Sequence, residues 1–315
     1  MVRNFLHKIN ISGKVLPQEP MHLHTSFRVG GPADVYVIPQ NLEELLEVIR
    51  AAEEFALPWL VLGEGSNVLV ADEGIEGVVI STFLLNHFHF KDHTLFAECG
   101  VSINSLVDAC CLSGKGGIEF LAGMPGTLGG AIWMNARCYG SEIAPVLGEV
   151  TYLDENLETA ILPVDLEKKQ FAYKRSPFQG KKWVILKATL NLYPADPVYL
   201  QKKAAEYRAD RELKGHYLAP SAGSIFKNDR TFGAPTGVIL DHLGFKGKRI
   251  GDAEASPLHA NIIINRGKAR AQDIYRLIQA MQDAVVKTYG RSLELEVLLL
   301  GRWDSQVEKA IFPPQ

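Results

Sequence analysis

The amino-acid sequence predicts an α+β protein with two or three subdomains. Strand, helix and hairpin patterns are mixed along the 315 residues, and no internal repeat or low-complexity tract interrupts them. Hydrophobic residues make up 47% of the chain and charged residues 22%, which is typical of a globular protein. The best boundary candidate is "PADP" at 194–197, because Asp196 followed by a proline can cap and start a helix.

The first half of the chain alternates short strands with two helices. Asn41, with Glu44 three positions later, is close to a capping box and opens a helix with an apolar stripe. A second helix covers roughly 103–113 and is expected to end at Gly114. Strand patterns lie at 59–62, 68–71 and 77–81, and alternating apolar positions predict a hairpin over 85–100.

In the second half, strand-like segments run from about 148 to 193. A polar helix follows the boundary and ends near Lys214. A helix with one apolar face covers about 271–289, and Gly290 is expected to end it. The remaining elements are a short helix at 236–243, a strand at 259–265 and a final strand at 293–301.

Charge and cysteine usage give no sign of nucleic-acid, membrane or metal partners. The formal net charge is −3, and the amino terminus lacks the apolar core of a signal peptide. The apolar runs are too short to span a bilayer. The histidines show no metal-ligand spacing, and those at 87, 89 and 93 are expected at the surface. Cysteines 99, 110, 111 and 138 are expected to be free thiols of a cytoplasmic protein.

A first glycine-rich stretch, "LGEGSNVLV" at 62–70, follows a predicted strand. A dinucleotide fingerprint fails there, because Val68 replaces the third glycine and a strand follows instead of a helix. No G-K-[ST] of a P-loop occurs anywhere. Two interpretations remain: a cradle in which Gly63, Gly65, Ser66 and Asn67 bind an anion, or a plain turn between strands.

A second stretch, "GMPGTLGGAIWMNARCYG" at 123–140, belongs to a segment that holds 8 of the 28 glycines. The run of Pro125, Gly126 and Thr127 resembles a helix entry, and small residues follow at Gly129, Gly130 and Ala131. They would let a phosphate or a planar ring approach free N–H groups at the helix start. The alternative is tight packing between helix and strand. Two such segments together favour a diphosphate ligand.

Three polar motifs carry candidate chemical groups. In "FAYKRSPF" (171–178), Lys174 and Arg175 would clamp a carboxylate or phosphate, or would form a solvated basic turn. In "LELEV" (293–297), Glu294 and Glu296 share one strand face, which is usually exposed to solvent. In "SAGSIFKN" (221–228), Ser224 is a helix cap, part of a phosphate loop or a group that does chemistry.

Taken in this order, the motifs resemble the UDP-N-acetylenolpyruvoylglucosamine reductases, the MurB family of peptidoglycan synthesis. The matching stretches are "TSFRVGGPA" (25–33), "LGEGSNVLV", "GMPGTLGGAIWMNARCYG", "YKRS", "SAGSIFKN", "HANIIIN" and "LELEV". Each is modest by itself, but together they cover the chain from about 22 to 300.

The resemblance implies a fold of the vanillyl-alcohol-oxidase type that holds non-covalent FAD. Two α+β subdomains (1–82 and 83–196) would enclose the flavin, a substrate-binding domain would cover 197–291, and the segment 292–315 would return toward the flavin. FAD would contact both glycine segments and Asn135, with Gly63, Gly65, Ser66 and Asn67 near its pyrophosphate. The protein is expected to act as a monomer on a small-molecule substrate.

The implied reaction has two halves. NADPH reduces FAD, and UDP-N-acetylglucosamine enolpyruvate then receives a hydride at C3 and a proton at C2, giving UDP-N-acetylmuramate. Because the hydride leaves negative charge on C2 and the carboxylate, the site needs a charge stabiliser and a proton donor. By family position Ser224 is the donor, and Glu296 with the residue after Tyr173 stabilises the intermediate. Asn228, Tyr173 and Lys227 would contact the substrate.

The chain departs from the family pattern at informative positions. The family usually has arginine after the tyrosine, where this chain has Lys174 and then Arg175; Lys174 is favoured as the stabilising cation, and Arg175 stays an alternative. Asp229 replaces a common proline, and "KGHY" (214–217) makes diphosphate contacts near Lys214 doubtful. The chain resembles the shorter subclass without a tyrosine-bearing insert. A flavin-dependent alcohol oxidase and a flavin-free nucleotide-sugar-binding protein remain as competing interpretations.

Overall fold

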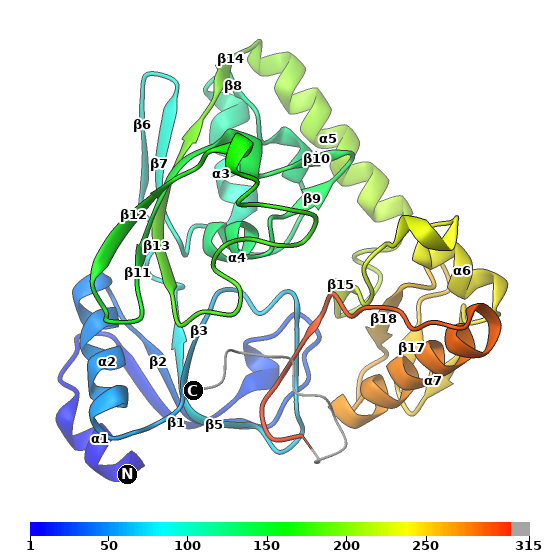
Figure 1. The fold of residues 1–315 in the computed structure, drawn as a ribbon, viewed down its shortest axis with the longest axis horizontal. Coiled ribbons are helices and arrows are strands. Elements are labelled where there is room, and N and C mark those ends of the chain that lie inside the picture. Colours follow the sequence, from blue (N-terminus) through cyan, green and yellow to red (C-terminus); the bar gives the residue numbers. More distant parts are fainter. Residues whose placement is uncertain (304–315) are drawn as a thin grey trace.

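The computed structural model describes residues 1–303, and its amino-terminal part is a four-stranded sheet (Figure 1). The strand order is β1-β2-β5-β3, with β1 and β2 antiparallel and the other pairs parallel. Helix α2 lies against this sheet. The elements are α1 (Val2–Lys8), β1 (Lys14–Pro20), β2 (Pro32–Ile38), α2 (Leu42–Glu54), β3 (Trp59–Leu62), β4 (Val68–Val70) and β5 (Ile75–Ser81).

The middle of the chain forms an antiparallel sheet of five strands in the order β12-β11-β13-β7-β6. Its buried side chains share one continuous core with those of the amino-terminal sheet. The strands are β6 (Phe88–Lys91), β7 (Thr94–Glu98), β11 (Leu147–Leu153), β12 (Thr159–Pro163) and β13 (Val184–Asn191). Between them lie α3 (Ile103–Leu112), β8 (Lys115–Gly116), α4 (Leu128–Trp133), β9 (Arg137–Cys138) and β10 (Ser141–Glu142).

The long helix α5 (Pro197–Leu213) follows the two-residue strand β14 (Tyr193–Pro194) and leads to a third sheet, of order β15-β18-β17-β16. Figure 1 shows this carboxy-terminal part beside the other two, with α5 running toward it. Its elements are β15 (Ser221–Ser224), α6 (Thr236–His242), β16 (Arg249–Ile250), β17 (Ala253–Ala255), β18 (Ile262–Asn265) and α7 (Ala271–Tyr289). Short 3₁₀ turns lie at Met21–Leu23, Glu119–Leu121, Ala144–Val146, Leu166–Lys168 and Arg230–Phe232.

The last strand, β19 (Leu298–Leu300), pairs in parallel with β4. Leu298 is the register partner of Val68, so residues about 230 positions apart lie side by side. The core of the carboxy-terminal part also includes Phe27 and Leu69 from the start of the chain. The three parts are therefore joined by strand pairing and by shared apolar contacts.

Most predicted element ends are confirmed. Asn41 caps α2 by accepting the Glu44 N–H, and Asp196 caps α5 by accepting the Val198 N–H. The return half of the capping box is absent, because the Glu44 carboxylate accepts backbone N–H groups from 40, 12 and 13 instead. Gly290 ends α7 with φ +72°, in the left-handed region that favours glycine.

The final strand is shorter than predicted. Regular pairing covers only Leu298–Leu300, whereas Leu295 forms a single bridge with Phe226. The domain limits 1–82, 83–196 and 197–291 stay predictions. Residues 304–315 of the predicted segment 292–315 lie outside the described residues. Within residues 1–303, no helix combines the length and apolar character that crossing a bilayer requires.

Candidate active site

Loops from all three parts of the molecule surround one cavity of about 2250 Å³. Pockets for single ligands usually measure roughly 300–1,000 Å³, so this one has room for a cofactor and a substrate together. Most of the predicted site residues line it. They are Gly63, Gly65, Ser66, Asn67, Pro125, Gly126, Thr127, Gly129, Gly130, Ala131, Lys174, Ser224 and Glu296.

The loop between β3 and β4 is an anion-competent turn. Gly65 has φ +60°, and a Cβ there would lie 2.2 Å from the His24 carbonyl oxygen, so only glycine fits. Ser26 fixes the loop by donating its N–H to the Gly65 carbonyl. The N–H groups of Gly65, Ser66 and Asn67 donate to no residue of 1–303. These N–H groups are therefore available to a ligand in the cavity.

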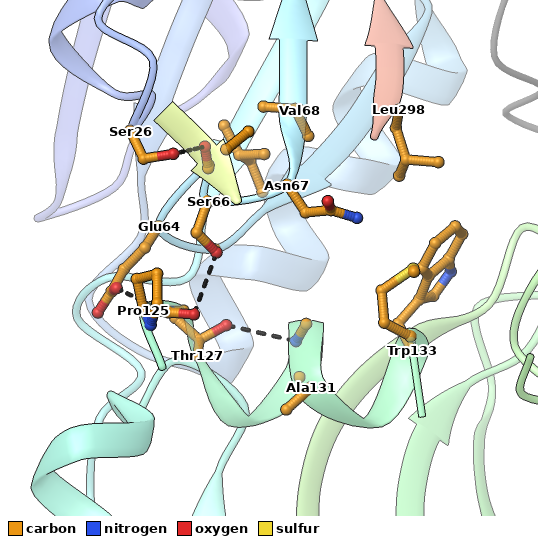
Figure 2. A pocket seen from close by; sticks show the side chains of 18 of the residues that line it. Ser26, Glu64, Ser66, Asn67, Val68, Pro125, Thr127, Ala131, Trp133 and Leu298 are labelled. Atoms are coloured by element: carbon orange, nitrogen blue, oxygen red, sulfur yellow. Dashed lines mark hydrogen bonds between the residues drawn. The ribbon is translucent and has the colours of Figure 1, made fainter. Parts of the chain in front are cut away.

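Figure 2 shows this loop next to the second glycine segment, with Ser66 pointing toward Pro125. The Ser66 hydroxyl donates to the Pro125 carbonyl at 3.3 Å, and Glu64 accepts the Gly126 N–H at 2.8 Å. A Cβ at Gly63 would lie 2.4 Å from the Thr127 hydroxyl oxygen. The two segments are therefore tied directly to each other.

The start of α4 is not a free anion site, which corrects the sequence interpretation. The Leu128 and Gly129 N–H groups donate to the carbonyls of 101 and 99 at 2.9 and 2.8 Å. Thr127 caps the helix by accepting the Gly130 N–H at 3.4 Å. Because these donors are already used, Gly129 serves close packing: a Cβ there would lie 3.0 Å from that of Cys99, whereas a Cβ at Gly130 would lie 3.6 Å from the Thr127 hydroxyl oxygen, an ordinary contact.

Lys174 and Glu296 form an ion pair in the cavity wall, with 2.5 Å between Nζ and Oε1. Each side chain is only 13% exposed. Lys174 sits at φ +56° in a tight turn, whose ends, Ala172 and Arg175, exchange both backbone hydrogen bonds. Glu296 is thus largely buried, whereas Glu294 pairs with Lys227 and is 64% exposed. The two carboxylates do not share one exposed strand face as predicted.

Asn135 holds this turn in place and does not line the cavity. Its side chain is fully buried, donates to the Ala172 carbonyl at 2.8 Å and accepts the Ala144 N–H at 3.2 Å. A direct contact with FAD would require the amide to leave both partners. Asn135 therefore positions the turn that carries Lys174 and does not make the predicted contact with FAD.

Ser224 ends strand β15, opposite Ile262, so it is not a helix cap. It lines the same cavity as Lys174 and Glu296. The next residue, Ile225, accepts the Glu296 N–H at 2.8 Å, and the Asn67 amide donates to the Glu296 carbonyl at 3.0 Å. These two bonds connect the end of β15, the loop at 63–67 and the segment before β19, which together form one wall of the cavity.

The remaining predicted residues lie beside the cavity. Arg175 is exposed and does not line it, so the geometry favours Lys174 over Arg175. The Tyr173 hydroxyl accepts the Asn228 N–H at 3.2 Å, and the Asn228 side chain accepts the Thr236 N–H at 2.8 Å. Lys227 points to Glu294 at 2.6 Å. Tyr173, Lys227 and Asn228 therefore do not line the cavity; they lie behind its wall and contact one another or neighbouring residues.

A basic and aromatic group near the end of α5 also lines the cavity, and sequence reasoning did not include it among the site residues. It consists of Tyr139, Arg211, Lys214, His216, Tyr217 and His259. Arg211 is 7% exposed, and its Nε finds no partner among the described residues. Burial, with the charges of Arg211, His259 and Lys214, lowers the pKa of His216 to about 4. The signal in the sequence was the density of cationic and aromatic side chains in "RELKGHY" (211–217).

Known families match both ends of the chain. Residues 33–156 match a model described as "FAD binding domain", and residues 215–300 match "UDP-N-acetylenolpyruvoylglucosamine reductase, C-terminal domain". A protein of Borrelia garinii subsp. bavariensis with the name UDP-N-acetylenolpyruvoylglucosamine reductase is 39% identical over 95% of this chain and 97% of its own length. The chain belongs to this reductase family. The protein of the same name from Synechococcus sp. is 40% identical over 93% of the chain and 94% of its own length.

A solved structure of the reductase family agrees with the fold. The crystal structure of the UDP-N-acetylenolpyruvylglucosamine reductase from Thermus caldophilus has a TM-score of 0.77 and 30% identity. The match covers 92% of this chain and all of that one. The predicted fold class is confirmed: an α+β FAD-binding fold of the vanillyl-alcohol-oxidase type, followed by an α+β carboxy-terminal domain.

The residues present fit the FAD of a reductase of this family. The cavity exceeds the volume of a single-ligand pocket, and the loop at 63–67 offers unpaired N–H groups of the kind that bind a pyrophosphate. The small residues of the second segment leave backbone close to the cavity. FAD would therefore be held mainly by the free N–H groups of the loop at 63–67, with the second segment lying close beside it.

Proposed function

We propose that this cavity carries out the reaction of its family: NADPH-dependent reduction of UDP-N-acetylglucosamine enolpyruvate to UDP-N-acetylmuramate, a step of peptidoglycan precursor synthesis. The observation that carries the proposal is the meeting of Ser224 with the Lys174–Glu296 pair in the cavity that the first glycine loop lines. A hydroxyl, a cation and a carboxylate in one wall are what an enolate-like intermediate requires.

The chemistry that FAD supplies when bound is acceptance of a hydride from NADPH and its donation to the enolpyruvyl C3. Negative charge then develops on C2 and its carboxylate. Ser224 donates its hydroxyl proton to C2, which a weak acid can do only toward a strongly basic carbon. Lys174 stabilises the developing charge, and Glu296 fixes the ammonium at 2.5 Å. Because both groups are largely removed from water, their electrostatic effect on the intermediate is strengthened.

The basic group near α5 suits the diphosphate of the substrate. Arg211 and Lys214 line the cavity, and Lys214 already pairs with Asp210 at 2.6 Å. Arg211 has no ion pair among residues 1–303 and keeps an unpartnered Nε. We therefore assign the diphosphate first to Arg211, with Tyr139 and Tyr217 beside it. This group takes the place of the tyrosine that the longer subclass carries in its insert.

We further propose that the enzyme acts as a monomer in the bacterial cytoplasm, without membrane or nucleic-acid partners. Four free cysteines support a reducing compartment, and burial raises the pKa of the Cys99 and Cys110 thiols to about 12. Its product would enter cell-wall biogenesis and so affect cell shape and division.

An absorbance spectrum followed by two half-reactions tests the function. The purified protein should be yellow, bleach with NADPH under anaerobic conditions, and regain its colour when UDP-N-acetylglucosamine enolpyruvate is added. NADH in place of NADPH measures the preference between the two donors. A preparation that cannot be reconstituted with FAD contradicts the proposal. So does a reduced flavin that oxygen reoxidises rapidly and the enolpyruvyl compound does not, which is the behaviour of an alcohol oxidase.

A further inference from the structure

Arg137 brings an uncompensated positive charge to the cavity. It lies in β9, lines the same cavity as Ser224 and Lys174, and is partly buried. Its guanidinium carbon is 5.4 Å from the centre of the Tyr173 ring. Glu142 is its register partner in β10, yet Arg137 forms no ion pair within 4.0 Å with any residue of 1–303. A half-buried charge without a partner is costly, which points to a ligand anion as its partner.

The other cations along the wall are engaged or differently placed. Lys174 pairs with Glu296 at 2.5 Å, and Lys214 pairs with Asp210 at 2.6 Å. Arg28 and Lys181 line the cavity without ion pairs among the described residues, but both are exposed. Arg211 is also buried and unpaired, but it belongs to the group near α5 that is assigned to the diphosphate. Among the partly buried cations of the described cavity wall, this leaves Arg137 with neither an ion pair nor an assigned ligand.

The Arg137 guanidinium lies over the aromatic ring of Tyr173. The Tyr173 ring packs against it, and the Tyr173 hydroxyl is fixed by the Asn228 N–H at 3.2 Å. A cation–π contact uses none of the guanidinium N–H donors, so they stay free for a planar, two-point contact. A carboxylate has the matching geometry, because its two oxygens accept the parallel donors of the fork.

The position of β9 also fits a substrate with two anionic ends. Burial raises the pKa of the Cys138 thiol, while Arg211 and Lys174 both act to lower it. Cys138, the neighbour of Arg137, thus lies within electrostatic reach of the catalytic pair and of the basic group near α5. Arg137, Lys174 and the basic group near α5 line the same cavity, so a substrate with two anionic ends can meet cations at both of them.

We propose that Arg137 binds the carboxylate of the enolpyruvyl group and so selects the enolpyruvyl ether over the same nucleotide sugar without it. The inference rests on the proposed function and adds a specificity residue to it. It also explains how the chain tolerates Lys174 in place of arginine: the planar fork that Lys174 lacks is supplied from β9.

Binding of two ligands to the oxidised holoenzyme tests this assignment. One is UDP-N-acetylglucosamine enolpyruvate, and the other is UDP-N-acetylglucosamine, which lacks the carboxylate. Arg137→Gln should weaken binding of the enolpyruvyl compound by about 10- to 100-fold and leave the other Kd within about twofold. Arg137→Lys should restore part of the affinity. Arg276→Gln, which removes an exposed arginine of α7, is the matched control and should bind both ligands like the parent protein.

The outcomes separate this inference from the proposed function. Equal weakening of both ligands by Arg137→Gln would mean that the arginine only supports Tyr173, and it would overturn the carboxylate assignment. Unchanged binding of the enolpyruvyl compound would overturn it as well. Failure of the proposed function is recognised earlier, in the parent protein, as an NADPH-reduced flavin that the enolpyruvyl compound does not reoxidise.

Discussion

Ser224 lines the cavity, and its hydroxyl has no hydrogen-bond partner among residues 1–303. Replacing it with alanine should leave flavin reduction by NADPH intact, because that half-reaction needs no proton on C2. Reoxidation by the enolpyruvyl substrate should slow by about 10²- to 10⁴-fold, the usual contribution of a positioned acid. Stopped-flow absorbance of the flavin measures both rates. Equal loss in both half-reactions would contradict the proton-donor role.

Lys174 and Arg175 are adjacent, and only their places in the turn distinguish them. Lys174→Met should slow substrate reduction by about 100-fold, since it removes the cation and leaves Glu296 unpaired. The effect of Arg175→Gln should be at least about tenfold smaller, because Arg175 is exposed outside the cavity. Single-turnover reoxidation rates make the comparison. Equal effects would mean that Arg175 takes part in the reaction.

His216 links stability to pH. In the unfolded chain it protonates near pH 6.5, whereas the folded protein keeps it neutral down to about pH 4. Protons therefore bind preferentially to the unfolded state between these values, and stability falls as pH is lowered from about 6.5 to about 4. After allowance for partial exposure the loss is on the order of 2 kcal/mol.

Thermal unfolding across this pH range checks the linkage. His216→Asn should flatten the pH dependence of Tm, whereas His89→Asn, on the exposed strand β6, should keep the parent profile. A parent protein whose Tm is constant from pH 6.5 to pH 4 would show that His216 is not held neutral by the fold.

At the scale of elements, the loop at 63–67 requires a glycine at position 65. Gly65→Ala adds the strain of a left-handed residue, about 1–2 kcal/mol, and a clash with the His24 carbonyl at 2.2 Å. We expect a lower Tm and weaker FAD binding, read from flavin fluorescence. Gly290→Ala shares the positive φ, but its Cβ would meet nothing within 4 Å. The control should therefore lose stability only, with an unchanged Kd for FAD.

The sequence predicted elements well where a cap or a period marks them. Asn41, Asp196 and Gly290 lie at their predicted ends because each satisfies a local backbone group. The sequence pattern predicted too long a last strand. The alternating residues 293–297 do not pair along one strand: Leu295 forms a bridge with Phe226, and Glu296 forms an ion pair with Lys174. It also misjudged the start of α4, whose N–H groups donate to residues distant in the chain.

For the molecule as a whole, the cavity depends on three parts that meet around it. Ligands that bind only this arrangement stabilise it by mass action. FAD at about 100 times its Kd should add about 2.7 kcal/mol, and raise the Tm of the apoprotein by roughly 4 °C. Adding the enolpyruvyl substrate should raise Tm further only when FAD is present. An apoprotein whose Tm does not change when FAD is added would contradict the cofactor assignment.

The parts are joined by contacts that no local pattern reveals. Leu69 and Phe27 pack into the carboxy-terminal core, and β19 pairs with β4. Arg302 contacts both carboxylate oxygens of Asp34 at 2.9 Å. Such pairings depend on side chains that are far apart in sequence, so periodicity and capping signals carry no trace of them.

By itself the sequence determined the order and type of most elements, the two glycine segments, and the family to which Ser224, Lys174 and Glu296 point. These are local properties, set by hydrogen-bonding caps, apolar periodicity and short motifs. Only the tertiary structure decided that Lys174 and not Arg175 faces Glu296, that Asn135 braces the turn, and that Arg137 reaches the cavity unpaired. The physical reason is that burial and charge pairing depend on which distant groups share a wall, and folding alone brings them together.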